Sequence, residues 1–191
     1  MKSRATGRTQ AGALMIEVLI AVALVVLGML AVMKIQGRLQ ESEFESYQRT
    51  QALLLLNDMV HRLESNRNNA DDYVTASAVG ANCVAPAAGA PRQLVDMFQW
   101  CSALQGAGET QSGGNVGAMI DGRGCVEATV GPGVREYMVT VTWQGFTPLT
   151  APPASISCAA NAYDQADVGC VDDRCRRFVS TVVRMADLEA L

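Results

Sequence analysis

Glu17 is the side chain in this sequence whose position makes its chemistry most unusual. It is the only charged residue among the 21 residues at positions 13–33, which are otherwise almost entirely apolar. A carboxylate in a lipid bilayer costs a few kcal/mol toward the centre and less near the interface, so an acid in such a run is by default a functional candidate. Glu17 is therefore the first candidate functional residue.

The six cysteines are the second set of residues that could do chemistry. An even number of cysteines on one side of a candidate membrane segment favours disulfide bonds in an oxidising compartment. Six cysteines can pair in many ways, and the sequence does not choose among them. All of them follow the apolar run: Cys83, Cys101, Cys125, Cys158, Cys170 and Cys175.

The sequence gives little support for a metal site. There is no Cys-x-x-Cys, and the single histidine, His61, lies 22 residues before the nearest cysteine. An acidic stretch near the C-terminus could bind calcium, but its spacing is not that of an EF-hand, and a solvated loop is the preferred interpretation. Its acids are Asp164, Asp167, Asp172 and Asp173. We therefore expect no metal and no cofactor.

Enzymatic and nucleic-acid-binding functions are both disfavoured. No phosphate-loop lysine follows the paired glycines, no Gly-x-Ser-x-Gly motif occurs, and one histidine with bridged cysteines leaves little for nucleophilic catalysis. The first 12 residues hold three of the 15 basic residues and none of the 19 acids, so the remainder has a net charge of −7. A surface of that sign is poorly suited to nucleic-acid phosphates.

The apolar run must position Glu17. Residues 13–33 are long enough to cross a hydrocarbon layer of about 30 Å as a helix. A secretory signal would be shorter and would end at a small-residue cleavage site, which does not follow this run. A plain anchor fits better, because basic residues before the run and acids after it predict a cytoplasmic N-terminus and an exported remainder. That alternative leaves Glu17 unexplained.

The helix is predicted to continue beyond the membrane to about position 67. This stretch has no proline, and its apolar residues recur at helical spacing after the charged positions 41–45. These residues are Tyr47, Leu54, Leu55, Met59 and Leu63. The asparagine-rich sequence from Asn66 onward is expected to end the helix with a left-handed cap.

The residues from about position 70 predict a globular head and an α+β class. A short helix is expected from Pro91, and the glycine-rich residues 106–117 are expected to form a surface connection. Alternating apolar residues predict strands at 126–130, 137–143 and 178–183. Short looped connections favour an antiparallel sheet with the long helix packed on it. The face expected to be apolar in the short helix consists of Leu94, Phe98, Cys101 and Leu104.

The N-terminal residues resemble the class III leader of type IV pilins and pseudopilins. The shared features are a short basic leader, Gly12, an apolar Ala13, Glu17 at the fifth position after the glycine, and a long apolar helix. The resemblance implies that prepilin peptidase cleaves after Gly12 and methylates the new amino terminus at Ala13. It also implies that Glu17 meets the ammonium of a neighbouring subunit when the helices assemble into a filament.

Further positions resemble the minor pilin family PilV, the type IV pilus modification proteins. They are residues 51–59 with Arg62 and Asn66-Arg67, then Trp100, Gly122-Arg123-Gly124-Cys125 and residues 137–145. The implied fold is pilin-like, with a long N-terminal α-helix packed on a small antiparallel β-sheet head. The implied parts are a leader at 1–12, a transmembrane and filament-core helix at 13–33, an amphipathic periplasmic half-helix at 34–69 and a disulfide-containing head at 70–191.

The same resemblance implies a location and partners. The protein would span the bacterial inner membrane once, with its head in the periplasm, and would be assembled into the pilus at the cell surface. Its partners would be other major and minor pilins, prepilin peptidase and the inner-membrane assembly platform, and it would support pilus assembly, adhesion and twitching motility. Two alternatives stay open: a minor pseudopilin of a type II secretion system, and a simple membrane-anchored periplasmic binding module.

Overall fold

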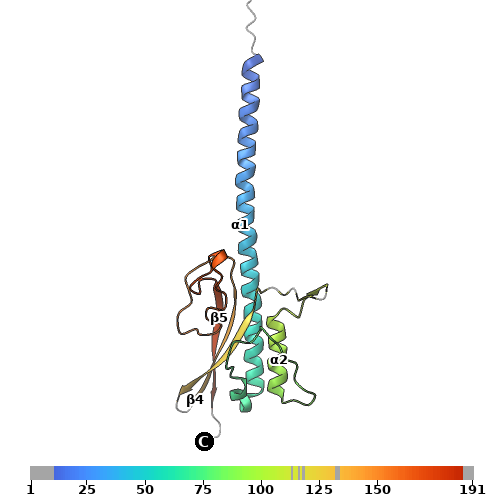
Figure 1. Cartoon of the computed structure of the whole chain (residues 1–191), viewed down its shortest axis with the longest axis vertical. Helices are drawn as coiled ribbons and strands as arrows, with labels where there is room; N and C mark the ends of the chain where they lie inside the picture. The colour runs from blue at the N-terminus through green and yellow to red at the C-terminus, as the bar shows by residue number, and fades with distance from the viewer. Residues whose placement is uncertain (1–10, 113, 116, 118, 132–133, 187–191) are drawn as a thin grey trace, which may run out of the picture. The chain divides into compact units, whose positions relative to one another are not determined.

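The structure, a computed structural model, describes residues 11–112, 114–115, 117, 119–131 and 134–186 of the 191-residue chain. It contains two compact units, the first ending at Glu43 and the second beginning at Phe44. One long helix, α1 (Ala11–Ser65), contributes to both units (Figure 1). Residues 1–10 of the predicted leader lie outside the described residues.

The described part of the first unit is the N-terminal part of α1. No proline interrupts it, and leucine, methionine and alanine, which favour helices, make up much of its sequence. Among the described residues, α1 is the one helix long and apolar enough to cross a membrane. A candidate membrane span therefore occupies the region where the apolar run predicted one.

The second unit is built on a three-stranded antiparallel sheet. Its strands are β3 (Arg123–Gly131), β4 (Val134–Gln144) and β5 (Arg176–Ala186). The central strand, β4, pairs with both neighbours, and Val139 lies opposite Val126 on one side and Thr181 on the other. The three predicted strands are confirmed, and the α+β architecture matches the pilin-like fold expected from the sequence (Figure 1).

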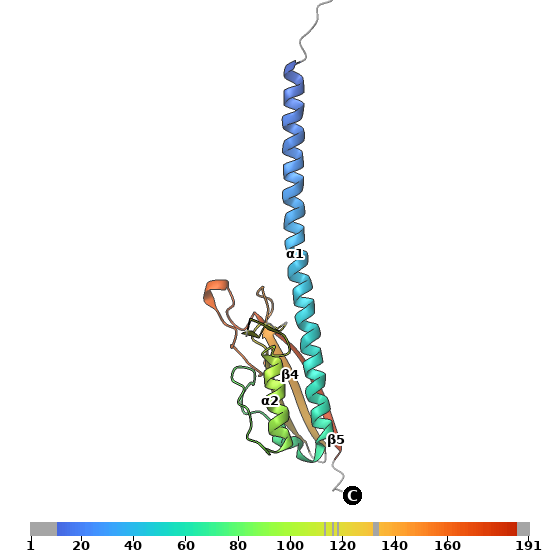
Figure 2. The ribbon, with the colours of Figure 1, turned by 90° about the vertical axis from the view of Figure 1, so that its right-hand side faces the viewer.

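One face of the sheet carries the hydrophobic core of the second unit. The odd-numbered residues of β4, from Tyr137 to Trp143, are all buried on this face. The C-terminal part of α1 and the helix α2 (Arg92–Leu104) lie beside the sheet and supply the opposing side chains (Figure 2). Those side chains are Ala52, Leu56, Met59, Leu63, Trp100 and Leu104.

The buried face of α1 differs in part from the predicted one. Met59 and Leu63 are in the core, but Tyr47 and Leu54 are 44% and 58% exposed. Four consecutive leucines at positions 53–56 fit more than one helical stripe. The sheet selects the stripe that contains Leu56, which is buried.

α1 ends at Ser65, and the predicted left-handed cap is wrong. Asn66 has a φ of −124°, and a 3-10 helix, η1 (Arg67–Tyr73), continues the chain. The asparagine amides make side-chain hydrogen bonds instead. Asn69 Nδ2 donates to Asn66 Oδ1 (2.8 Å), and Asn66 Nδ2 donates to the hydroxyl of Tyr73 (3.3 Å).

Two expectations for the segment after η1 also need correction. In α2, Cys101 and Leu104 are buried as expected, but Leu94 is 51% exposed, and the inward face also holds Asp96 and Trp100. The reason is that Asp96 is drawn inward by polar partners, described below, and the large Trp100 ring fills the core. In the glycine-rich segment, β1 (Thr110–Gln111) pairs with β2 (Gly114–Asn115), so it is not only a connection.

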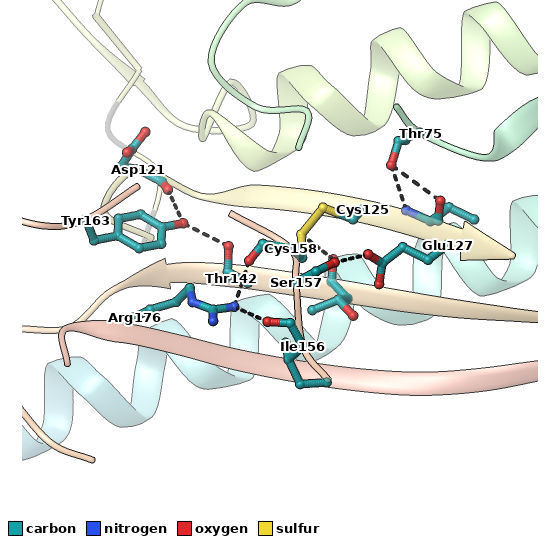
Figure 3. The surroundings of a disulfide bond; sticks show 12 residues. Thr75, Asp121, Cys125, Glu127, Thr142, Ile156, Ser157, Cys158, Tyr163 and Arg176 are labelled. Carbon is teal, nitrogen blue, oxygen red and sulfur yellow. Dashed lines mark hydrogen bonds between the residues drawn. A yellow bond between two sulfur atoms is a disulfide. The ribbon is translucent and has the colours of Figure 1, made fainter. Parts of the chain in front are cut away.

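The other face of the sheet is covered by the segment between β4 and β5, which includes the short 3-10 helix η2 (Ala166–Val168). Thr140 and Thr142 of β4 are therefore fully buried. The hydroxyl of Tyr163, in this covering segment, lies 2.9 Å from the hydroxyl of Thr142 (Figure 3). Arg176 Nη1 donates to the carbonyl oxygen of Ile156 (2.9 Å). A loop with little regular structure thus supplies a layer that strand alternation alone does not reveal.

Three disulfides join the six cysteines, which confirms the expected bonds. The pairs are Cys83–Cys101, Cys125–Cys158 and Cys170–Cys175. The first ties the preceding loop to α2, the second ties the covering segment to β3 (Figure 3), and the third closes a short loop before β5. Disulfides typically contribute about 2–4 kcal/mol each, so they stabilise a head whose connections are long.

Gly124 of β3 lies directly under the ring of Trp100. A Cβ at this position would be 2.7 Å from Cζ2 of Trp100, whose Nε1 donates to the carbonyl oxygen of Leu55 (2.9 Å). We expect Gly124→Ala to lower the free energy of unfolding by about 1–3 kcal/mol, because the ring must leave its position in a packed core. Urea unfolding followed by tryptophan fluorescence measures the change. The control is Gly108→Ala, whose Cβ meets nothing within 4 Å; equal losses for both variants would contradict the packing argument.

Candidate assembly site

The N-terminal part of α1, in the first unit, presents a continuous apolar surface. Every residue from 15 to 43 is exposed, and the large apolar side chains between Met15 and Ile35 are 49–72% accessible. Burying one such side chain is worth about 1.5–3 kcal/mol. Because many of them are exposed together, water is a poor surrounding for this helix, and lipid or other apolar helices are good ones.

Glu17 is the single charged residue on this surface up to Met33. It lies in α1 one helical turn after Ala13, with Gly12 in the same helix. Helix positions four residues apart share a face, so a charge created at Ala13 would lie on the side of the helix that carries Glu17. The structure thus places the three N-terminal candidate residues within one short stretch of α1.

The next charged residue after Glu17 is Lys34, followed by Arg38 and Glu41. At 1.5 Å per residue, the 17 steps from Glu17 to Lys34 span about 25 Å of helix. A bilayer that accommodates the apolar residues between them would hold Glu17 near one of its edges. The free-energy cost of a charged carboxylate is lower near the edge of the bilayer than at its centre. Glu17 can therefore stay in the membrane before it pairs with a positive charge.

Where the second unit begins, at Phe44 and Glu45, α1 is tied to the sheet region by an ion pair and an aromatic contact. Arg177 Nη2 of β5 lies 3.3 Å from Glu45 Oε1. The rings of Phe44 and Phe146 meet edge to face, with their centroids 5.2 Å apart. Arg177 also donates to the carbonyl oxygen of Thr147 (2.7 Å). These contacts hold the part of α1 that belongs to the head.

Asp96 is a buried carboxylate that sequence reasoning missed. It is 2% exposed, and it joins three elements: Arg62 Nη1 of α1 donates to its Oδ1 (2.8 Å), and the hydroxyl of Tyr73 in η1 donates to its Oδ2 (2.7 Å). Arg62 Nε also donates to Asp58 Oδ2 (2.9 Å). The signal that the sequence offered was an acid at helical spacing from the apolar residues Trp100 and Leu104.

Two acids of the stretch 164–173, Asp164 and Asp173, make hydrogen bonds within the head. Arg176 Nε donates to both carboxylate oxygens of Asp173 (2.9 and 2.8 Å), and Arg176 is itself buried. Asp164 Oδ1 accepts from the backbone N–H of Asp173 (2.9 Å). Among the described residues, no group of three or more His, Cys, Asp or Glu side chains is arranged to hold a metal ion.

Buried tyrosines make the stability of the head sensitive to alkaline pH. Burial, followed by the hydrogen bond to Asp71 (2.5 Å), raises the pKa of Tyr137 to about 12. Burial also raises the pKa of Tyr73 and of Tyr163. Such a tyrosine keeps its proton in the folded state at a pH where the unfolded chain loses it. Its contribution to stability is therefore present below pH 10 and is lost as the pH rises toward the folded-state value.

We expect the free energy of unfolding of the full-length protein in detergent to fall between pH 10 and 12. Tyr137→Phe is expected to reduce the slope in that window by about 1.4 kcal/mol per pH unit, because one coupled deprotonation is removed. Urea unfolding at several pH values measures the slope. A slope unchanged by the substitution would contradict the assignment to Tyr137.

No protein-family model, no curated protein and no solved structure matches this chain. The function is therefore inferred from the chemistry of its own residues.

Proposed function

We propose that this protein is a minor type IV pilin of the PilV kind, processed by prepilin peptidase and inserted into a pilus or its initiation complex. The observation that carries the proposal is a single carboxylate, Glu17, on an exposed apolar helix at the fifth position after Gly12. A soluble domain would not expose such an apolar surface to water, and a plain membrane anchor does not require a charged side chain in its apolar run.

The chemistry of assembly follows from the two charges that processing would bring together. Cleavage after Gly12 would release an ammonium at Ala13, while Glu17 keeps its carboxylate in apolar surroundings. Each charge is costly alone and cheaper when paired. In a filament, Glu17 of one subunit would meet the ammonium of a neighbour. A subunit placed in the wrong axial register would leave both charges unpaired, so the pair would also select the register.

The head is proposed to be exposed at the pilus surface for contacts with other molecules, and not to catalyse a reaction. Three disulfides hold its loops on a small sheet, which suits a domain that works outside the reducing cytoplasm. The head would lie in the periplasm while α1 spans the inner membrane, and at the pilus surface after assembly. Its partners would be other major and minor pilins and the assembly platform, and it would support pilus assembly, adhesion and twitching motility.

Processing of the N-terminus tests this proposal most directly. We expect protein purified from the native membrane to begin at Ala13 and to carry one methyl group on the new amine, as measured by mass spectrometry of the intact chain and of its N-terminal peptide. Gly12→Asp is expected to retain the leader, because a charged side chain replaces glycine at the cleavage site.

The matched control is Gly28→Ala, in the same helix, where an added Cβ meets nothing within 4 Å. This variant is expected to be processed like the original protein. A mature chain that begins at Met1 would contradict the proposal and would favour a simple membrane-anchored module.

A further inference from the structure

A pocket in the second unit lies between α1 and the C-terminal end of α2. Its volume is about 220 Å³, several times the roughly 30 Å³ that a water molecule occupies in the liquid, so a short chain of carbon atoms fits in it. Leu104 belongs to the hydrophobic core, and Leu55 and Met119 pack against that core, so the floor of the pocket is apolar. Ala103 completes the apolar side chains that line it.

Glycines leave one side of this pocket free of side chains. Gly106 and Gly117 both line it, and a Cβ added to Gly106 would lie 2.3 Å from the Cα of Gly117. Gly106 also has a φ of +74°, in the left-handed region that favours glycine. The close approach of the two backbones thus requires glycine at both positions.

Glu109 is the one charged residue among the described residues that line the pocket. Its Oε1 accepts a long hydrogen bond from the hydroxyl of Tyr47 (3.5 Å), and the described part of the chain gives it no ion pair. Gln51, the other polar side chain at the pocket, donates from Nε2 to the same hydroxyl (3.5 Å). A carboxylate without a cation therefore lies beside an apolar pocket.

The charge of the second unit also favours a cation at this pocket. From Phe44 onward the sequence has 10 arginines, no lysine and 16 acidic residues, a net charge of −6. A field of that sign attracts cationic ligands. An anionic ligand would be repelled by Glu109, and a neutral apolar ligand would remove water from the carboxylate without replacing its hydrogen bonds.

We propose that this pocket binds an alkyl ammonium, a chain of four or five carbon atoms that ends in a primary amine. The carbon atoms contact Leu55 and Met119, and the ammonium pairs with Glu109. An ammonium suits this carboxylate better than a guanidinium, whose fork uses both oxygens in parallel, because Oε1 already accepts from Tyr47. The source of the ammonium is a lysine side chain of another protein or a free alkyl amine.

The proposal goes beyond the assembly role of Glu17 and does not depend on it. Every residue that lines the pocket lies in the second unit, whereas Glu17 lies in the first. A failure of pocket binding therefore leaves the proposed pilin function unchanged, and unprocessed protein would leave the pocket unchanged.

The test uses the full-length protein in micelles of a zwitterionic detergent, with amide NMR shifts to locate each probe. N-acetyl-lysine methylamide is compared with N-acetyl-norleucine methylamide, which has the same carbon chain and lacks only the amine. We expect shifts at the amides of Ala103, Gly108 and Glu109, and binding of the lysine compound about fivefold tighter than that of the norleucine compound, because an exposed ion pair contributes up to about that factor.

A third probe, n-pentylammonium, distinguishes the two sources of the ammonium. Tighter binding of the lysine compound than of n-pentylammonium would identify a protein side chain as the ligand. Tighter binding of n-pentylammonium would identify a free amine. Both results support the proposal, since both probes bind through an ammonium.

Two variants separate the charge from the apolar pocket. Glu109→Gln keeps the size of the side chain and removes its charge, so we expect the lysine and norleucine compounds to bind equally. Ala103→Leu fills the pocket, and we expect it to weaken binding of all probes at least about tenfold. The matched control is Glu64→Gln, an exposed acid of α1 outside the pocket, which is expected to keep the preference for lysine. The urea midpoint of each variant reports that its fold is intact.

Three results would overturn the proposal. The first is the absence of shifts at the pocket amides at millimolar concentrations of the lysine compound. The second is equal binding of the lysine and norleucine compounds to the original protein. The third is a preference for lysine that Glu109→Gln retains, which would assign the charge recognition to another residue.

Discussion

Replacing Glu17 by alanine is expected to leave the protein in the membrane but to lower its recovery in sheared filaments about a hundredfold or more. The neighbouring subunit's ammonium would remain in apolar surroundings without a partner, and an uncompensated buried charge costs about 3–5 kcal/mol. Since about 1.4 kcal/mol corresponds to a factor of ten, even the lower value predicts a loss of two orders of magnitude. Quantitative immunoblots of the membrane fraction and the sheared fraction measure the ratio.

The controls for this prediction distinguish the charge from the position. Glu17→Gln keeps the shape of the side chain and loses its charge, so it is expected to behave like the alanine variant. Glu41→Ala removes an exposed acid from the same helix beyond the apolar run and is expected to be incorporated normally. Undiminished incorporation of Glu17→Ala would refute the assembly role.

Replacing Asp96 by alanine is expected to lower the free energy of unfolding of the head by about 3 kcal/mol. The substitution leaves the hydroxyl of the buried Tyr73 without its acceptor and removes one of the two carboxylates that Arg62 contacts. Removing one partner of a buried ion pair costs about 3–5 kcal/mol, and Arg62 is 19% exposed and keeps Asp58, which places the effect at the lower end. Urea unfolding of the full-length protein with its disulfides intact measures the change.

Arg92 offers a matched control, because its Nε contacts the same carboxylate oxygen (3.0 Å) from an exposed position. An exposed ion pair contributes about 0–1 kcal/mol, so Arg92→Ala is expected to change the unfolding free energy by no more than that. Asp96→Asn keeps the shape and part of the acceptor capacity and is expected to lie between the two. Equal effects of Asp96→Ala and Arg92→Ala would contradict a buried network centred on Asp96.

The strands show which features of the sheet a local sequence pattern can predict. In β4, valine, tyrosine and tryptophan alternate with other residues, and a strand places alternate side chains on opposite faces. That pattern predicts both the strand and its inward face, from Tyr137 to Trp143. It does not predict that Thr140 and Thr142 are also buried, because their cover comes from a segment later in the chain.

The helices show where a local pattern fails. In α1, consecutive leucines are compatible with more than one buried stripe, and in α2 the apolar residue Leu94 is exposed while the acid Asp96 is inside. The choice depends on partners distant in sequence. Arg62, which contacts Asp96, lies 34 positions before it in the sequence. The carbonyl oxygen of Leu55 accepts a hydrogen bond from Trp100, and Leu55 lies 45 positions before Trp100.

The apolar run with its lone carboxylate, the three strands and the oxidation of the cysteines to disulfides could all be predicted from the amino-acid sequence. Each of these depends on composition or on spacing within a few residues, where hydrophobic periodicity and charge act locally. The folded head sets three further features: which cysteines pair, across separations of 18, 33 and 5 residues, which carboxylate is buried beside Arg62, and which edge of the sheet pairs with no further strand among the described residues. These outcomes depend on distant segments meeting in a packed core, and no local pattern encodes that meeting.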